Sequence, residues 1–208
     1  MSPVFSRHNP LSRRNALSLL LAGGALAACS TQPPRPRFPD LTYGHLGQFT
    51  LDVARVDIVS EYKAPLTSPN VDHLFPTPPE QIVRRWAQDR LAASGKPGRF
   101  ARFIIQDAKV TEAELPRTPG LRGAFTTDQT QRYDGVLSTV VEIREERGNF
   151  RAGTASAWAS RSRTVAEGIT VNDRDKVFFD LIEAMMNDLN AEMDRQIRAN
   201  LTQFVVMR

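Results

Sequence analysis

Hydrophobic and polar positions alternate in two stretches of the second half of the chain. In residues 132–144 one parity is mostly apolar and the other polar, and residues 150–163 form a second two-faced run. A period of two is typical of β-strands that have one covered face. Arg147-Gly148-Asn149 lies between the two runs and favours a tight turn. The pattern therefore predicts an antiparallel hairpin.

Two further strands are expected nearer the N-terminus. Residues 49–59 alternate with a change of phase near Ala54, which indicates a strand with a bulge, and residues 101–111 form another strand. Five prolines in residues 61–79 exclude a regular element there and predict an irregular crossing. We expect this crossing to pack against the core through its large apolar residues, which are Leu66, Val71, Leu74 and Phe75.

A helical period predicts two helices. The first spans residues 80–95, and Thr77 and Glu80 have the spacing of a capping box at its start. The second follows Thr170-Val171-Asn172-Asp173, ends near Phe204 and would be roughly 45 Å long. Its apolar stripe consists of Phe178, Leu181, Ile182, Met185, Leu189, Met193, Ile197 and Leu201. Each helix therefore has one face suited to covering a sheet.

The order of elements is strand, helix, three strands and helix, with no internal repeat. Helices packed on one face of a mostly antiparallel sheet make an α+β domain with two layers. We therefore expect a single domain over residues 41–208. It would contain a sheet of about four strands with two helices on one face, the C-terminal helix being the longer.

The N-terminus has the composition of an export signal. Arg13 and Arg14 precede an apolar run, residues 16–28, that is shorter than the about 20 residues needed to span a bilayer. Leu26-Ala27-Ala28-Cys29 ends this run and resembles the lipobox of bacterial lipoproteins. The resemblance implies that residues 1–28 are a lipoprotein signal peptide and that the Cys29 thiol is acylated. A plain secretory signal beside an unrelated cysteine is the alternative.

The residues after the lipobox bear on where the protein would reside. By the sorting pattern of bacterial lipoproteins, Ser30 favours transfer to the outer membrane, whereas Asp at this place favours retention in the inner membrane. Residues 29–40 carry four prolines and predict an extended tether between the lipid anchor and the domain. We therefore expect a lipid-anchored protein on the periplasmic face of the outer membrane. Arg13-Arg14 suits either the general or the twin-arginine export route.

Net charge gives little support to a nucleic-acid partner. The chain has 27 Lys and Arg against 23 Asp and Glu, a formal charge of +4. Residues 1–28 contain three arginines and no acid, so their removal leaves 24 basic against 23 acidic residues, a charge of +1. A nearly neutral body lacks the basic field that nucleic-acid binding needs.

The sequence contains no recognisable catalytic, cofactor or metal motif, so we assign no residues to those roles. Its three histidines, His8, His45 and His73, lie outside any known nucleophile motif, and Asp72 is merely adjacent to His73 in sequence. The lone Cys29 is assigned to lipid, so a zinc site would lack thiolate ligands. Three arginines are expected on one face of the last strand, and this face is either a site for an anionic ligand or an ordinary solvent face: Arg151, Arg161 and Arg163.

The layout resembles two families of small periplasmic lipoproteins. These are the LPS-assembly lipoproteins of the LptE type and the auxiliary lipoproteins of ABC-type lipid transporters, the PqiC type. The matching segments are the lipobox, the helix around VRRWAQDRL, the hairpin and the segment TVNDRDKVFFDLIEAMMNDL. The resemblance implies a non-enzymatic accessory or scaffold subunit in envelope assembly or lipid transport, bound to an envelope protein. The alternatives are a lipid-tethered hydrolase using His45, His73 and Asp72, and a lipid carrier with an apolar cavity between helix and sheet.

Overall fold

A computed structural model describes residues 38–116, 129–166 and 168–206. The predicted signal peptide, the lipobox Leu26-Ala27-Ala28, Cys29 and most of the tether lie outside the described residues. Residues 37–208 form one compact unit. The helices and strands in chain order are β1 (Phe49–Leu51), β2 (Val56–Ser60), α2 (Pro79–Arg90), β3 (Leu91–Ala93), β4 (Arg99–Glu114), β5 (Gln129–Glu145), β6 (Arg151–Ala166) and α3 (Val171–Asn200).

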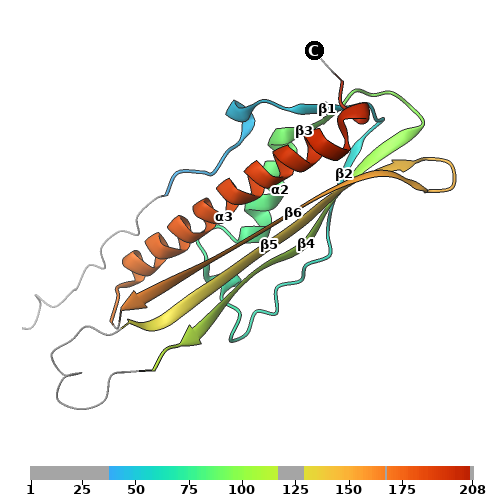
Figure 1. Cartoon of the computed structure of the whole chain (residues 1–208). Coiled ribbons are helices and arrows are strands. Elements are labelled where there is room, and N and C mark those ends of the chain that lie inside the picture. Colours follow the sequence, from blue (N-terminus) through green and yellow to red (C-terminus); the bar gives the residue numbers. More distant parts are fainter. Residues whose placement is uncertain (1–37, 117–128, 167, 207–208) are drawn as a thin grey trace, which may run out of the picture. The chain divides into compact units, whose positions relative to one another are not determined.

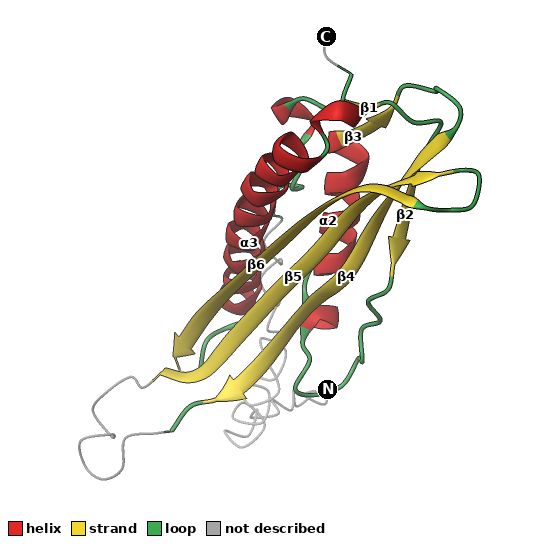
Figure 2. Ribbon diagram, turned by 45° about the vertical axis from the view of Figure 1, so that its right-hand side comes forward, coloured by secondary structure: helices red, strands yellow, loops and turns green. Residues whose placement is uncertain are grey.

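The main sheet confirms the predicted α+β fold. It has four strands in the order β2-β4-β5-β6, with β2 parallel to β4 and the other neighbours antiparallel. Both helices pack on the same face: Trp86 of α2 lies 5.6 Å from Phe103 of β4, and Phe178 of α3 lies 4.9 Å from Tyr133 of β5, between ring centroids. Figures 1 and 2 show the two helices on one side of the long strands.

The single strand expected over residues 49–59 is instead two strands in different sheets. β1 pairs in parallel with β3, with Phe49 opposite Leu91, whereas β2 joins the main sheet beside β4. The phase change near Ala54 is therefore a break, not a bulge. Val53 is fully buried at this break, and its N–H donates to the carbonyl of Leu51 two residues back, which turns the chain out of β1.

The first helix differs from the sequence prediction at both ends. Its N-cap is Pro78, and no side chain caps it, so the predicted capping box is wrong. Two consecutive prolines fix the entry into the helix, which leaves Thr77 one position too early to cap it. Glu80 pairs with Arg84 at 2.6 Å instead. The helix ends at Arg90, because the next residues form β3 beside β1.

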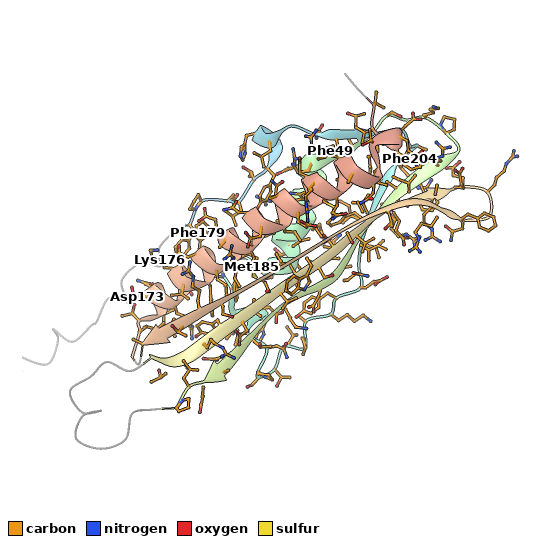
Figure 3. All side chains as sticks on the ribbon, in the orientation of Figure 1. Phe49, Asp173, Lys176, Phe179, Met185 and Phe204 are labelled. Carbon is orange, nitrogen blue, oxygen red and sulfur yellow. The ribbon has the colours of Figure 1, made fainter. Side chains whose placement is uncertain are left out.

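The long helix α3 begins with a side-chain cap and ends near the predicted position. The hydroxyl of Thr170 accepts a hydrogen bond from the backbone N–H of Asp173 at 3.1 Å. The helix has 30 residues and ends at Asn200, followed by a short 3-10 turn that includes Phe204. Met185 points from α3 toward the sheet, whereas Lys176 and Asp173 lie at the exposed start of the helix (Figure 3).

The proline-rich crossing packs on the core in part, as predicted. Phe75 is buried and stacks on Phe178 with ring centroids 4.1 Å apart, and Val71 is buried as well. Leu66 and Leu74 are exposed, so the prediction was wrong for these two residues. The crossing is therefore attached to the core at Val71 and Phe75 rather than along its whole length.

Small side chains on β5 and β6 leave room for α3 and the turn after it to pack directly on the strands. Ala155, Ala157 and Ala159 are at most 3% exposed because the helix covers them. A Cβ added to Gly153 would come within 2.8 Å of both Leu201 and Phe204, and one added to Gly135 would come within 2.5 Å of the Met185 sulfur. The strip of small residues is thus a contact surface for α3 within the domain.

Candidate docking surface

The face of the sheet opposite the helices is open in the described part of the chain (Figure 2). Leu137 and Val141 of β5 point toward the helices and are fully buried, so the even-numbered residues between them, 138 and 140, point to the open face. Strand register brings together the neutral side chains at the centre of this open face: Val59, Ile104, Val136, Ser138, Val140, Ser156 and Trp158. Trp158 is 61% exposed and Val59 38% exposed. This face offers apolar area that the domain itself does not use.

Charged residues around this neutral centre are paired with one another. Arg132 contacts Asp134 at 2.8 Å, and Lys109 contacts Asp107 at 2.8 Å. Pairs of this kind at a surface contribute little to stability, but they leave neither sign of charge in excess. The open face is therefore a neutral patch with a balanced polar surround, which favours a protein partner over a polyanion.

The three arginines predicted to share one face of β6 are separated in the structure. A register shift between Ile143 and Arg144 places Arg151 directly opposite Arg144, and both contact Glu142, at 3.2 and 2.6 Å. The arginine at 161 instead reaches α3, where its guanidinium donates two hydrogen bonds to Asp188 at 2.6 and 2.9 Å. The structure therefore brings Arg151 and Arg161 to two different acids.

The third arginine, Arg163, shows no ion pair with any of the described residues, and it lies opposite Tyr133. Thus two of the three guanidinium groups are already neutralised within the domain. The sequence alone did not predict that Arg151 and Arg161 would bind different acidic residues. Glu142 stands among the polar positions of β5, but a register shift of one residue at a hairpin cannot be read from the alternation of side chains.

Glu142 connects the two strands of the hairpin at the open face. Burial alone would raise the pKa of its carboxyl, but the hydrogen bonds from Arg144 and Arg151 outweigh burial and lower the pKa. The carboxylate is only 8% exposed and stays ionised at neutral pH. It fixes the beginning of β6 against β5 and was not identified by the sequence analysis.

The turn of the hairpin presents an aromatic side chain. Gly148 and Asn149 both have positive φ, 77° and 54°, as a tight turn between strands requires. Arg144 donates to the side-chain oxygen of Asn149 at 2.7 Å and to its carbonyl at 2.8 Å, which holds the turn in place. Phe150 follows and is 73% exposed. Phe150 and Trp158 are the two most exposed aromatic side chains among the described residues. The alternation of residues 150–163 predicts them on one face, but the register shift at the start of β6 separates them.

The histidines lie in two separate surface hollows. Asp72 and His73 line a hollow of about 300 Å³ together with Tyr62. Burial, and then the neighbouring Asp72 carboxylate, raise the pKa of the Tyr62 phenol. His45 lines a different hollow of about 340 Å³ that also contains Glu183 and Asn187. The structure therefore does not bring together the three residues that a hydrolase site was expected to use.

Among the described residues, no three side chains of His, Cys, Asp or Glu are placed to hold a metal ion together. Neither α2 nor α3 contains a stretch that is both long and apolar enough to span a bilayer.

Comparison with known proteins gives no family for this chain. No family model matches the sequence, and no curated protein matches it. A DUF330 protein from Xanthomonas campestris is similar in structure at 13% identity and a TM-score of 0.30, covering 79% of this chain and 89% of that one. A PelC dodecamer from Paraburkholderia phytofirmans has 12% identity and a TM-score of 0.21, covering 75% and 94%. Likeness of this strength supports no functional conclusion.

Proposed function

We propose that this chain is a non-enzymatic lipoprotein, held by acylated Cys29 in the outer membrane and facing the periplasm. It would act as an accessory or scaffold subunit in envelope assembly or lipid transport. The lipobox Leu26-Ala27-Ala28-Cys29 supports the anchor, and the proline-rich residues 30–40 support a tether. The domain would thus be held near the membrane and free to meet a partner there.

One observation supports a binding role more than any other. The four-stranded sheet has helices on one face, while no helix or strand among the described residues packs over the face with Trp158 and Val59, although Ile104 on this face is only 8% exposed. Exposed apolar area of this kind on a folded domain usually marks an interaction site. An exposed aromatic side chain beside a neutral patch with polar surroundings is typical of protein interfaces.

A pull-down from mild detergent tests the binding role. The full lipidated chain is isolated from membranes of cells that produce it, in parallel with Trp158→Ser and a control variant, Lys176→Ser, on the exposed start of α3. We expect an envelope protein that is recovered with the wild type and the control but is depleted with Trp158→Ser. Recovery of no envelope protein above background, or equal recovery with all three chains, would contradict the proposal.

The lipid anchor is tested separately by Cys29→Ser. We expect the wild-type chain in the membrane fraction and the variant unprocessed or released from that fraction. A Cys29→Ser chain that is still cleaved and still held in the membrane would show that the lipoprotein assignment is wrong. This result would leave the docking surface untouched, so the two parts of the proposal fail independently.

The geometry supports the two alternative functions less well. A hydrolase using His45, His73 and Asp72 would need those residues in one cleft, and they line two different hollows. A lipid carrier would need an apolar cavity between α3 and the sheet. In the described part of the chain, this interface is filled by fully buried side chains such as Phe178 and Met185.

A further inference from the structure

Strand β6 is the last strand of the sheet, and its backbone groups alternate in direction. The carbonyl of Thr130 accepts from the N–H of Leu115, so the even-numbered residues of β5 face β4 and the odd-numbered ones face β6. Pairs such as Leu137 with Ala159 then show that odd-numbered residues of β6 bond to β5. The N–H and C=O groups that point to the free edge therefore belong to even-numbered residues, which are Thr154, Ser156, Trp158, Ser160 and Ser162.

Between residues 153 and 160, this free edge has none of the features that usually prevent strand pairing. Such features are short edge strands, prolines, bulges and charged side chains, lysine above all. β6 has 16 residues and no proline or lysine, and residues 152–160 carry no charge. Its pairing with β5 is regular from residue 153 to residue 165. Along this length the edge is a continuous row of donors and acceptors.

Only an extended backbone matches such a row, and the position of α3 excludes antiparallel pairing with a second copy of the chain. The helix lies directly over Ala155, Ala157 and Ala159. A second copy added antiparallel to β6 would bring its own α3 over the neighbouring strand, about 4.8 Å away. Packed helices need roughly 8–10 Å between their axes, so the two helices would collide. A segment without a helix on that face meets no such obstacle.

We propose that the free edge of β6 binds an extended segment of a partner protein, which adds a strand to the sheet. Main-chain hydrogen bonds would provide affinity, and alternate side chains would provide specificity. On the open face, the segment would place an aromatic or β-branched residue beside Trp158. On the helix face, it would carry small residues beside α3 and an acidic residue near Arg163. This inference rests on the proposed docking function and specifies how the partner is held.

Photo-cross-linking in the producing cells tests the geometry. A benzophenone amino acid is placed in the full chain at Ser156, at Ser160 or, as a position on the open face away from the edge, at Ser138. Residues four apart in a strand are separated by about 13 Å. We therefore expect the attachment points of the Ser156 and Ser160 probes to map about four residues apart within one segment of one partner. Attachment to unrelated segments, or to a second copy of this chain, would overturn the inference.

A proline variant tests the hydrogen bonds. Because the N–H of Ser160 points to the free edge, Ser160→Pro removes an edge donor without removing a bond between β5 and β6. With the probe at Ser156, we expect the adduct to fall at least fivefold in Ser160→Pro and to remain in Ser160→Ala. Thermal unfolding of both variants must match the wild type, and if Ser160→Pro unfolds early, Ser162→Pro replaces it. An adduct of equal yield in the folded proline variant would overturn the inference.

The Ser138 probe separates this inference from the proposed function. A partner captured from Ser138 but from neither edge position would support docking through the open face and overturn edge pairing. No partner captured from any of the three positions would contradict both.

Discussion

The two edges of the sheet differ in how they are covered. The outer edge of β4 is covered first by β2 and then by the proline-rich crossing, whose Val71 donates its N–H to the carbonyl of Val110 at 2.8 Å. Further along, the N–H of Glu112 donates to the carbonyl of Pro69 at 2.8 Å. The free edge of β6 has no comparable partner among the described residues.

This difference explains why an irregular, proline-rich segment belongs in a compact domain. Backbone groups of the crossing satisfy β4, but its prolines prevent it from growing into a strand that could recruit another chain. The edge of the sheet at β4 is thus protected against pairing with another chain, whereas the edge at β6 is not protected by any described residue. Substitutions that remove the cover from one edge, or block the other, can test this asymmetry.

Among the substitutions that test the two edges, the largest effect is expected from removing the attachment of the crossing. Phe75→Ala deletes a buried ring that stacks on Phe178, and we expect a loss of about 3–4 kcal/mol in the free energy of unfolding. Urea denaturation measures it. Leu74→Ala is the matched control, because Leu74 is 46% exposed and its loss should cost less than about 1 kcal/mol. Equal losses would mean that Phe75 does not anchor the crossing.

A smaller loss is expected from enlarging the contact between α3 and β6. Ala157→Leu inserts atoms where the strand meets the helix, and we expect a loss of about 2 kcal/mol in stability through overpacking. Ser156→Leu changes the neighbouring residue, which is exposed, and should alter stability by no more than about 0.5 kcal/mol. Thermal denaturation compares the two. If Ala157→Leu is as stable as Ser156→Leu, the helix does not lie as close to β6 as the small residues indicate.

The beginning of β6 should respond to acid through Glu142. Glu142→Gln removes the charge that binds Arg144 and Arg151, and we expect a loss of about 1–2 kcal/mol at pH 7. The folded pKa of Glu142 lies below its ordinary value of about 4.3, so its contribution is complete above that value and is lost as the pH falls through the lowered pKa.

Urea denaturation of both chains at pH 7 and at about pH 3 checks this dependence. The difference in stability between wild type and Glu142→Gln should shrink at the lower pH. A difference that stays constant between the two values would show that the ionised form of Glu142 does not stabilise the hairpin.

The smallest effect on stability is expected at the uncovered edge. Trp158→Ser removes a side chain that is 61% exposed and should change the free energy of unfolding by no more than about 0.5 kcal/mol. Trp86→Ser is the contrast, because Trp86 is fully buried and donates to Asn190 at 2.9 Å. Its loss should cost about 3–5 kcal/mol. A large loss of stability in Trp158→Ser would mean that Trp158 supports the fold and is not displayed for a partner.

The predictable part of the fold depended on side-chain periodicity over long elements. The hairpin strands and the long helix each repeat their side-chain pattern at least four times. The period of the buried positions therefore determines whether the segment is a strand or a helix. The break near Ala54 and the strand that begins at Leu91 could not be predicted. β1 and β3 have three residues each, and these strands exist only because they pair with one another. Pairing between strands that short depends on tertiary contacts, which local sequence does not encode.

Less of the candidate surface was predictable. The two faces of β6 were evident from the alternation from residue 153 onward. The predicted shared side of Phe150 and Trp158 was wrong, because the register shift between Ile143 and Arg144 sets Phe150 opposite Glu145, whereas Trp158 lies opposite Ser138 on the other face. The pairing of Arg161 with Asp188 was not, because the partner lies on α3 and 27 residues away. Glu142 was not identified, since its two arginines converge only through a register shift at the hairpin. Side-chain contacts that depend on strand register or on the position of a helix can be identified only from the folded structure.

Oxidation of the methionine side chains on α3 would depend on how often this helix separates from the sheet. Met185, Met186 and Met193 are fully buried. Peroxide turns an accessible methionine into a polar sulfoxide, which suits a packed interior poorly. Each thioether can therefore react only in molecules whose helix has lifted from the sheet, and once oxidised it resists repacking. In an oxidising compartment, the fraction of sulfoxide at these positions would therefore rise with the frequency at which the helix opens from the sheet.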